Sequence, residues 1–428
     1  MAQGKRHVSR KQMEARLLRK AANVAVPATC DVCVVGGGAS GLVAAIMAAE
    51  AGSSVVVLER DLECGRTILA TGNGRCNFAN VDLAPKHYNQ PEFVAAVMGR
   101  NPLDRILGFF RECGLVWCQE DGRLYPSSLQ AASVRNVLLA RAVEAGVVLA
   151  PAREALDVAR GADGPVVSFQ EMWDDGGRCT LPCRSLVIAS GGGAPASASL
   201  EIPLVERRPV LCPLVCEPSP LSELDGRRAA CIATLVRDDM PLARERGEVL
   251  FRNYGLSGIC VFDLSRLARP GDTIELDLVP DLTVKEVGQR LGLEPGLTVD
   301  YHPSPRTALD GMLDPAIADV LWSLADSPWA QEHLPQRLGS VEGAGVLALV
   351  KGLPFRVTGP ADESHAQVTA GGIATSAVDP ATMGLRDVPD VFACGEALDV
   401  DGDCGGYNLS FAWASGMRAG ESAAKAVR

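Results

Sequence analysis

A glycine-rich segment between an apolar run and a helical stretch is the first feature whose residue types indicate chemistry. In Gly36-Gly37-Gly38-Ala39-Ser40-Gly41 the first glycine permits a tight turn, and the second lets backbone amides approach a pyrophosphate. The third allows close helix–strand packing, and Glu59, after the next apolar run, can accept hydrogen bonds from ribose hydroxyls. This spacing predicts a dinucleotide site, against the alternative of a purely structural turn. The residues expected to bind are Gly36, Gly38, Ser40, Gly41 and Glu59.

A second block, Ala70-Thr71-Gly72-Asn73-Gly74-Arg75-Cys76-Asn77, combines glycines with small polar residues. Thr71, Gly72 and Gly74 let backbone amides approach a flat ligand, and Arg75 offers a positively charged guanidinium group with several hydrogen-bond donors. A surface loop is the alternative interpretation of the same composition.

A third block runs from Cys394 to Asn408. Gly395 and the acid Glu396 follow a strand, where Glu396 could bind a ribityl hydroxyl. Gly406 and the residue before it leave the N-terminus of the last helix open near Asn408, which could stabilise negative charge on a reduced flavin. Three aspartates in the block invite a calcium interpretation. Cys404 and Ser410 stand where that loop needs Gly and Glu, so no metal site is predicted.

The elements around the first block form one βαβ unit, with a strand at 31–35, a helix at 42–51 and a strand at 54–58. The fold class is therefore α/β, with a Rossmann-like dinucleotide domain. Further elements are expected as helices at about 91–113 and 129–145, strands at 165–171, 178–190 and 391–394, and a terminal helix at 409–427.

The residue composition and the hydrophobic pattern change in the middle of the chain. Prolines and short apolar runs from about 200 to 280 indicate an antiparallel β domain, and 283–352 is mainly helical in pattern. The pattern of short apolar strands and glycines seen in the first part returns after about residue 366, so an inserted domain interrupts the dinucleotide domain. The expected division is a basic extension at 1–28, the first part of the FAD domain at 29–195, a β-rich middle domain at 196–282, a helical insert and return at 283–352, and the second part at 353–428.

Together the three blocks resemble the BaiN-like family of NAD(P)/FAD-dependent flavoproteins, also labelled aminoacetone-oxidase-type. Residues 122–128, 247–258 and 367–372 match it too, and the resemblance covers about residues 30–428. It implies a two-dinucleotide-type FAD domain, a β-rich middle domain and a small helical insert. The chain departs from the family at Thr67, where lysine is common, and in a short segment after Gly193. The expected FAD contacts, from motifs and resemblance together, are Gly36, Gly38, Ser40, Gly41, Glu59, Arg66, Thr71, Gly72, Gly74, Arg75, Gly395, Glu396, Gly406 and Asn408.

The chemistry would then belong to the flavin, with the protein supplying position and electrostatics. We expect hydride transfer between FAD and a small organic carbonyl, enone or amine, with Tyr407 and Cys76 as the catalytic candidates and Tyr407 as a proton donor. The five histidines are taken as ordinary surface or satisfied residues. A thiol–flavin exchange through Cys76 and Cys404 is one alternative, and a non-catalytic FAD-binding redox sensor or docking protein is another. NAD(P)H stays open as electron donor, because no second strand–GxGxxG–helix unit occurs.

Composition bounds the partners. A net charge of −11 argues against a general nucleic-acid binder. No apolar run approaches the ~20 residues of a membrane span, and no secretory signal is evident, so we expect a cytoplasmic chain with free thiols at its 14 cysteines. Residues 1–20 carry seven Lys/Arg against Glu14, which predicts a solvated basic extension or a contact with an acidic partner or membrane surface. The sequence sets no oligomeric state.

Overall fold

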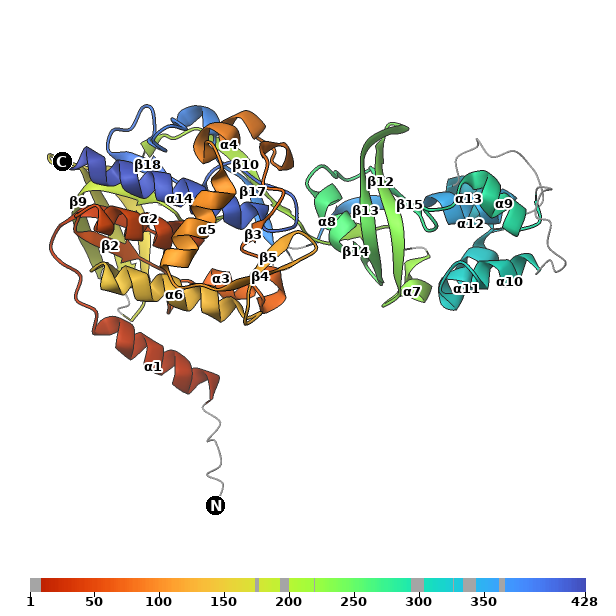
Figure 1. Ribbon diagram of the computed structural model, residues 1–428, viewed down its shortest axis with the longest axis horizontal. Helices are drawn as coiled ribbons and strands as arrows, with labels where there is room; N and C mark the ends of the chain where they lie inside the picture. The colour runs from red at the N-terminus through yellow and green to blue at the C-terminus, as the bar shows by residue number, and fades with distance from the viewer. Residues whose placement is uncertain are drawn as a thin grey trace, which may run out of the picture. The chain divides into compact units, whose positions relative to one another are not determined.

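The computed structural model describes residues 9–173, 177–192, 200–218, 220–293, 304–325, 327–333, 344–361 and 366–428. The chain forms two compact units (Figure 1). The first consists of Met1–Arg208 together with Thr369–Arg428, and the second consists of the intervening sequence Pro209–Val368. The expected five-part division of the chain stays a prediction.

A seven-stranded sheet forms the centre of the first unit. Five of its strands run parallel in the order β6, β2, β1, β9 and β18, with β18 branching from β9. Val35 pairs with Leu58 on one side and with Ile188 on the other, and Ile188 also pairs with Ala393. Four strands therefore end level at one edge of the sheet. Their bounds are Cys30–Val35 for β1, Val55–Leu58 for β2, Val148–Ala150 for β6, Arg178–Ile188 for β9 and Val391–Ala393 for β18.

The long strand β9 belongs to two pairings. Its second half lies beside β1, and its first half continues into an antiparallel pair with β8, Pro165–Glu171, which pairs in turn with β7, Arg153–Arg160. This confirms the strands expected at 165–171 and 178–190.

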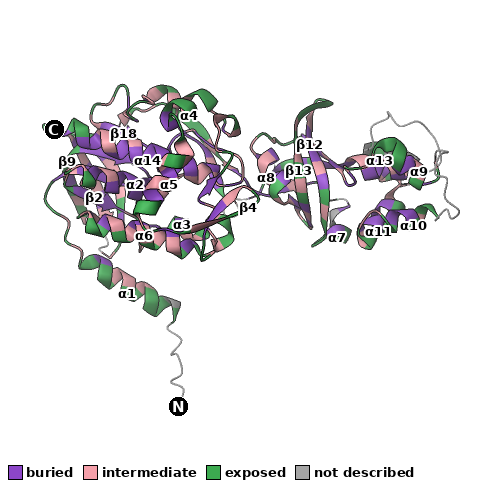
Figure 2. Cartoon of the chain, viewed as in Figure 1, coloured by how far each residue is buried: buried purple, intermediate pink, exposed green. Residues whose placement is uncertain are grey.

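Two helices pack closely together beside this sheet. These are α2, Ala39–Glu50, and the terminal helix α14, Tyr407–Ala426 (Figure 1). A Cβ on Gly416 would lie 2.5 Å from the carbonyl oxygen of Ser40, and one on Gly420 would collide with that of Ala44. Only glycine permits this approach, which leaves most of α14 buried (Figure 2).

The helical stretch expected over 91–113 forms two helices, α4 at Pro91–Met98 and α5 at Pro102–Glu112. Gly99 and Asn101 have φ of 67° and 53°, which no helix interior accepts, and Pro102 then begins the second helix. The stretch at 129–145 is confirmed as α6, Ala131–Glu144.

The basic extension contains a helix, α1, from Arg10 to Ala22. Ser9 caps it in a reciprocal pair with Gln12, and its end is fixed to the first unit. The buried Arg153 donates to the carbonyl oxygens of Ala21 and Val24, at 3.3 and 2.8 Å, and pairs with Glu171. The described part of the extension is thus anchored helix, with a largely exposed surface (Figure 2).

The loops of the first unit carry short elements that matter for the site. They are α3 at Arg66–Ala70, η1 at Thr71–Gly74, β3 at Ala79–Asn80, η2 at Pro85–His87, β4 at Trp117–Glu120, β5 at Arg123–Pro126, β10 at Leu204–Val210, β17 at Val368–Ile373, η5 at Thr375–Ala377 and η6 at Gly395–Ala397. Strands β3, β5 and β4 form one small antiparallel sheet, and β10 pairs with β17.

The second unit is a closed antiparallel barrel with attached helices, which confirms the β-rich and helical textures expected there. Its strands are β11 at Leu214–Cys216, β12 at Arg228–Arg237, β13 at Met240–Arg252, β14 at Gly255–Ser257, β15 at Thr273–Asp277 and β16 at Leu353–Pro360. Its helices are α7 at Leu221–Leu224, α8 at Ile259–Ser265, α9 at Val284–Arg290, α10 at Pro305–Asp310, α11 at Pro315–Leu324, α12 at Pro328–His333 and α13 at Ala344–Gly352.

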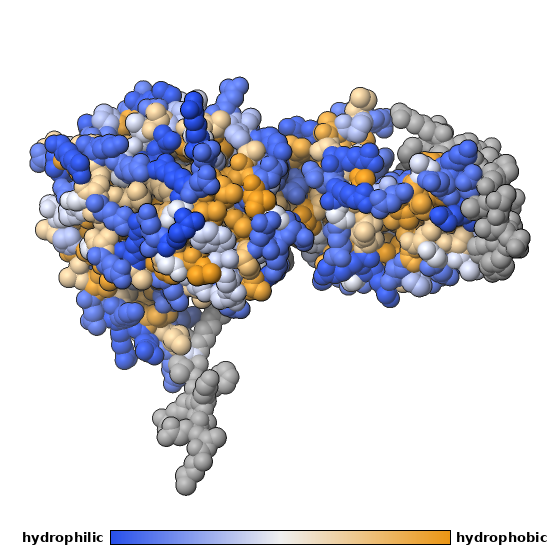
Figure 3. All heavy atoms as spheres, in the orientation of Figure 1, coloured by the Kyte–Doolittle hydropathy of each residue, from blue (hydrophilic) through white to orange (hydrophobic). Residues whose placement is uncertain are grey.

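Among the described residues, no helix combines the length and apolar character that crossing a membrane requires. On the face drawn in Figure 3, hydrophobic and hydrophilic residues are interspersed on both units.

Candidate functional site

The three sequence blocks meet at the edge where the parallel strands end. Gly36 follows β1, Glu59 follows β2, Ser190 lies two residues beyond β9, and Gly395 lies two residues beyond β18. Ligands of open α/β sheets bind at this carboxyl edge. Segments more than 350 residues apart in sequence therefore contribute to one site.

The glycine turn has the backbone geometry that its spacing predicts. Gly36 has φ of 104° and donates to the carbonyl oxygen of Leu58 at 2.8 Å. A Cβ on Gly41 would collide with the carbonyl oxygen of Gly36, so the helix packs on the turn only with glycine there. Gly38 is the N-cap of α2 and no side chain caps that helix. The first amides of α2 are thus available for a phosphate.

Glu59 supports the same turn. Its Oε2 accepts the N–H of Gly37 at 2.6 Å and its Oε1 accepts that of Asp61 at 2.7 Å. Burial raises the pKa of the carboxyl group, and these two backbone donors oppose the rise. Each oxygen retains a second lone pair for a ribose hydroxyl. Arg66 is different: its side chain is 60% exposed and lies 3.4 Å from Asp61, so the structure gives it only a weak contact.

The second block is a tight, left-handed segment. Gly72, Asn73, Gly74 and Cys76 all have φ between 54° and 82°, and Thr71 donates to the carbonyl oxygen of Ile68 at 2.7 Å. A Cβ on Gly72 would lie 2.8 Å from the backbone nitrogen of Asn77. The glycines are therefore required by the loop itself.

Two side chains of this block have roles that composition did not show. Arg75 pairs with Glu120 at 2.6 Å and lies over the ring of Tyr125 at 4.4 Å, so its fork is directed to the β4–β5 hairpin. Cys76 is fully buried, and burial raises the pKa of its thiol to about 11. That thiol is protonated at neutral pH, which disfavours it as a nucleophile.

The third block packs directly on the first. Gly395 donates its N–H to Ser415 Oγ at 2.9 Å, and with φ of 64° it lies so close to Ser40 that a Cβ would collide with the serine hydroxyl. Ser40 therefore contacts the third block. Asn408 exchanges two hydrogen bonds with the backbone of Gly402, at 2.8 and 2.9 Å, and so closes the loop before α14.

Glu396 is half-buried beside a cation that no sequence motif indicated. Its Oε1 accepts the N–H of Thr369 at 2.9 Å, burial raises its pKa, and Arg207 opposes that rise. The Nη2 of Arg207 is buried with no hydrogen-bond partner in the described protein, and burial lowers its pKa. A guanidinium NH₂ left without an acceptor fits an anionic or carbonyl group of a ligand.

Further orphaned atoms face the same region. Asn77 Oδ1 and Ser190 Oγ are buried without a partner among the described residues. A Cβ on Gly406, whose φ is 95°, would lie 2.8 Å from that Asn77 oxygen, and no side chain caps α14. Buried polar atoms and an open helix start are the features that a bound dinucleotide would satisfy, so the residues present fit FAD.

His87, taken from sequence as an ordinary histidine, lies against Tyr407. The two rings stack with centroids 4.2 Å apart and an interplanar angle of 22°. Nδ1 of His87 lies 2.8 Å from Asp403, and Nε2 lies 3.1 Å from Asp82 and 3.4 Å from the Tyr407 hydroxyl. No sequence spacing links these residues, because 320 positions separate His87 from Tyr407.

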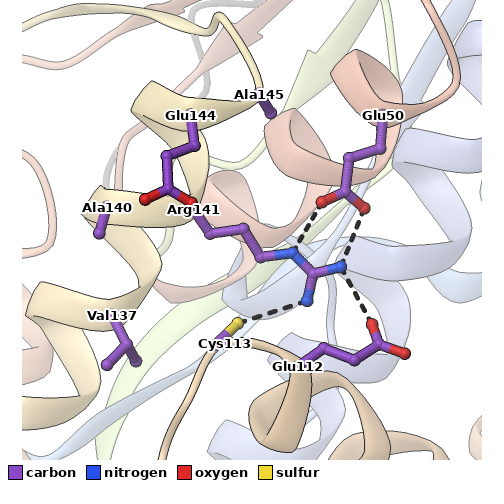
Figure 4. Close-up of a pocket in the computed structure, with 8 residues that line it drawn as sticks. All are labelled: Glu50, Glu112, Cys113, Val137, Ala140, Arg141, Glu144 and Ala145. Atoms are coloured by element: carbon purple, nitrogen blue, oxygen red, sulfur yellow. Dashed lines mark hydrogen bonds and ion pairs between the residues drawn. The ribbon is translucent and has the colours of Figure 1, made fainter.

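A hollow of about 500 Å³ lies elsewhere, between α2, α5 and α6 (Figure 4). Its central Arg141 already pairs with Glu50 at 2.7 Å and Glu112 at 3.1 Å, and donates to the carbonyl oxygen of Phe109. These bonds connect three helices, so Arg141 is structural. Within the described chain, no group of three or more metal-ligating side chains occurs, and the cysteines are free thiols as expected.

Comparisons with known proteins identify the family of the chain. The model of the HI0933-like protein Rossmann domain family matches residues 30–422. The 3-dehydro-bile acid delta(4,6)-reductase of Clostridium scindens is 31% identical over 92% of this chain and 98% of its own, and a ribosomal RNA dihydrouridine synthase of Escherichia coli is 25% identical over 90% and 96%. A solved flavocytochrome c3 fumarate reductase has a TM-score of 0.49 at 15% identity, over 96% of this chain and 81% of its own. The chain therefore belongs to the HI0933-like Rossmann-domain family of FAD-dependent oxidoreductases.

Proposed function

We propose that this FAD-dependent oxidoreductase reduces a carbon–carbon double bond conjugated to a carbonyl group in a small organic molecule. The observation that carries the proposal is the convergence of the glycine turn, two half-buried glutamates and the open start of α14 at one sheet edge. The name of the Clostridium relative, a delta(4,6)-reductase of a 3-dehydro-bile acid, supports an enone over a simple carbonyl or an amine.

The two ends of the cofactor would be held by different blocks. At the adenosine end, Gly36, Gly38, Ser40 and Gly41 would present backbone to the pyrophosphate, with Glu59 on the ribose. Arg66, the exposed first residue of α3, would be a further contact at the adenosine end. At the ring end, the contacts would come from Thr71, Gly72, Gly74, Arg75, Gly395, Glu396, Gly406 and Asn408.

FAD supplies a hydride to the substrate when it is bound and reduced. The chain's contribution is electrostatic and protic. The partial positive charge at the start of α14 stabilises negative charge that develops near Gly406. Tyr407, the first residue of that helix, would give the proton that completes the reduction. Cys76 would border the ring as a neutral thiol, since its pKa of about 11 excludes much thiolate at neutral pH.

The electron donor in this proposal is NAD(P)H, bound transiently at the flavin face. The sequence contains no second Gly-x-Gly-x-x-Gly motif, so a resident nicotinamide domain is not part of the proposal.

A second candidate substrate is a uridine in RNA. Two relatives, from Escherichia coli and Haemophilus influenzae, are ribosomal RNA dihydrouridine synthases, each 25% identical. The uracil ring also contains a double bond conjugated to a carbonyl group. The exposed Lys and Arg side chains of α1 offer cations for phosphate, although the whole chain carries −11.

The test measures the absorption spectrum of the purified protein and then compares two substrates in separate reactions. Purified protein should show flavin absorption and release FAD on denaturation, and NADH or NADPH should bleach the flavin under anaerobic conditions. A 3-oxo-4,6-diene bile acid and a uridine-rich ribosomal RNA fragment are then added separately. Reoxidation by the diene with loss of one of its carbon–carbon double bonds supports the first proposal, and reoxidation by RNA alone supports the second. Reduction without turnover of any enone, RNA or quinone would instead indicate a redox sensor, and absence of flavin would overturn both substrates.

A further inference from the structure

His87, which stacks on the sequence-predicted Tyr407, is a part of the site that no sequence motif indicated. It deepens the proposed function and rests on it, because it concerns the proton that an enone takes up. Three observations meet there: ring stacking at 4.2 Å, two carboxylates on the imidazole and the open start of α14 directly at Tyr407.

The imidazole is held by carboxylates at both of its nitrogens. Asp403 lies 2.8 Å from Nδ1 and Asp82 lies 3.1 Å from Nε2. In the imidazolium form each ring nitrogen donates, one N–H to each carboxylate, and the ring cannot rotate without losing both contacts. The His87 side chain is 18% exposed, so both contacts are partly shielded from water.

The Tyr407 side chain is buried, and the ring of Tyr88 lies edge-on to it with centroids 6.1 Å apart. Tyr88 also donates its hydroxyl to the backbone carbonyl oxygen of Tyr407 at 2.8 Å, which ties the start of α14 to Tyr88. The Tyr407 hydroxyl lies 3.4 Å from His87 Nε2.

We propose that His87, bound at its two ring nitrogens by Asp82 and Asp403, is a positioning residue whose imidazolium form makes Tyr407 the proton donor of the site. A positive charge beside a phenol favours the phenolate, so it strengthens the phenol as an acid. The start of α14 acts in the same direction at the same residue.

Other charged groups around His87 come from its own loop and from the neighbouring elements. Lys86 pairs with Asp82 at 3.1 Å on the exposed side. Arg123 of β5 reaches the neighbourhood of Gly405, where a Cβ would lie 3.7 Å from its Nε. Together Asp82, Asp403, Lys86 and Arg123 set the field at the two rings, and the imidazole of His87 is stacked on the Tyr407 ring.

The hydride enters the substrate's β-carbon, the π electrons move toward the carbonyl oxygen, and the α-carbon takes the proton from Tyr407 Oη. The O–H bond of Tyr407 breaks as the C–H bond forms, and the resulting phenolate is stabilised by the imidazolium until it regains a proton from His87 Nε2 or water. The electrons come from the reduced FAD that NAD(P)H supplies in the proposed function.

The test compares H87F, which keeps a stacked ring without its charge, with D403N and Y407F. Each protein is reduced under anaerobic conditions and reoxidised in separate runs by a 3-oxo-4,6-diene bile acid and by p-benzoquinone. The quinone accepts its proton on oxygen and needs no positioned acid. We expect H87F to slow the diene reaction about 10-fold to 100-fold, as for a weakened general acid, with quinone reoxidation changed less than about twofold. The alkaline limb of the diene rate should move to higher pH in H87F.

A second measurement does not depend on turnover. In a spectrophotometric alkaline titration of tyrosines, the component that Y407F removes should move to higher pH in H87F and, by less, in D403N. An unchanged titration and an unchanged diene rate in H87F would overturn the role of His87. A wild type that quinone reoxidises but the diene does not would overturn the enone proposal instead, and the titration would still decide the coupling of His87 to Tyr407.

Discussion

Gly37 donates its backbone N–H to Glu59 Oε2 at 2.6 Å, so the glycine turn and the end of the next strand are one hydrogen-bonded unit. The acid that sequence reasoning assigned to a ribose also supports the turn that would hold the phosphates. In the proposed function Glu59 would therefore serve both binding and local structure, and so would Glu396, which accepts the N–H of Thr369.

Replacement of Gly41 by alanine should abolish the FAD site. The new methyl group would collide with the carbonyl oxygen of Gly36, and backbone cannot move aside cheaply. We expect loss of bound FAD and destabilisation by about 2 kcal/mol or more, measured by flavin absorbance and by denaturant unfolding. The matched control is G108A in α5, where a Cβ meets nothing within 4 Å, and where alanine should stabilise by about 0.5–1 kcal/mol. A G41A protein with full FAD content would contradict the packing argument.

Replacement of Glu396 by glutamine should separate stability from cofactor binding. Burial raises the carboxyl pKa in the folded state, so the folded protein binds the proton more tightly than the unfolded chain. Protonated Glu396 stabilises the folded protein at pH values below the ordinary glutamate pKa, and this stabilisation is lost as the pH rises through the raised pKa of the folded state. At neutral pH the half-buried carboxylate therefore lowers the free energy of unfolding. E396Q should raise the melting temperature of the FAD-free protein at pH 7 but not at pH 4.

The same E396Q protein should bind FAD about 10-fold more weakly, since a hydrogen bond to a charged acceptor becomes a neutral one. Glutamine Oε1 can still accept the Thr369 N–H, so a structural collapse is not expected. Fluorescence titration of FAD measures the affinity. Equal affinity with higher stability would show that Glu396 does not contact the cofactor.

Replacement of Cys76 by serine distinguishes flavin chemistry from thiol exchange. Burial holds the thiol pKa at about 11, so the thiol is neutral across the physiological range. We expect turnover within about threefold of wild type, as for a residue that only packs, and alkylation of Cys76 by iodoacetamide that stays slow until strongly alkaline pH. A C76S protein that is reduced by NAD(P)H but inactive toward every acceptor would restore the thiol alternative.

Replacement of Arg153 by methionine should release α1. Arg153 joins the carbonyl oxygens of Ala21 and Val24 to Glu171, and methionine keeps its bulk without its donors. Loss of one partner of a buried ion pair typically costs about 3–5 kcal/mol. We expect faster tryptic cleavage at Arg16 and Arg19 in R153M, with FAD content retained. R184M, whose guanidinium is exposed and lies 3.7 Å from Asp31, is the control and should cleave like wild type.

The sequence by itself determined the cofactor class and the central fold. The turn Gly36–Gly41, the apolar strands beside it and Glu59 are local signals, because a tight turn, a buried strand and a helix start depend on neighbours within about 30 residues. The same local chemistry identified the antiparallel texture of the middle region and the terminal helix. It failed at 91–113, where two residues at positive φ and Pro102 break a pattern that periodicity alone reads as continuous.

Only the tertiary structure decided which side chains meet. Parallel pairing of β1, β2, β9 and β18 brings the ends of distant strands to one edge, and no local pattern encodes that register. The structure directs Arg75 to Glu120, places Arg207 beside Glu396, and stacks His87 on Tyr407 across 320 positions of sequence. These contacts arise from packing between elements, so their physical cause lies in the folded chain, and the sequence could supply only the residue types that the fold brings together.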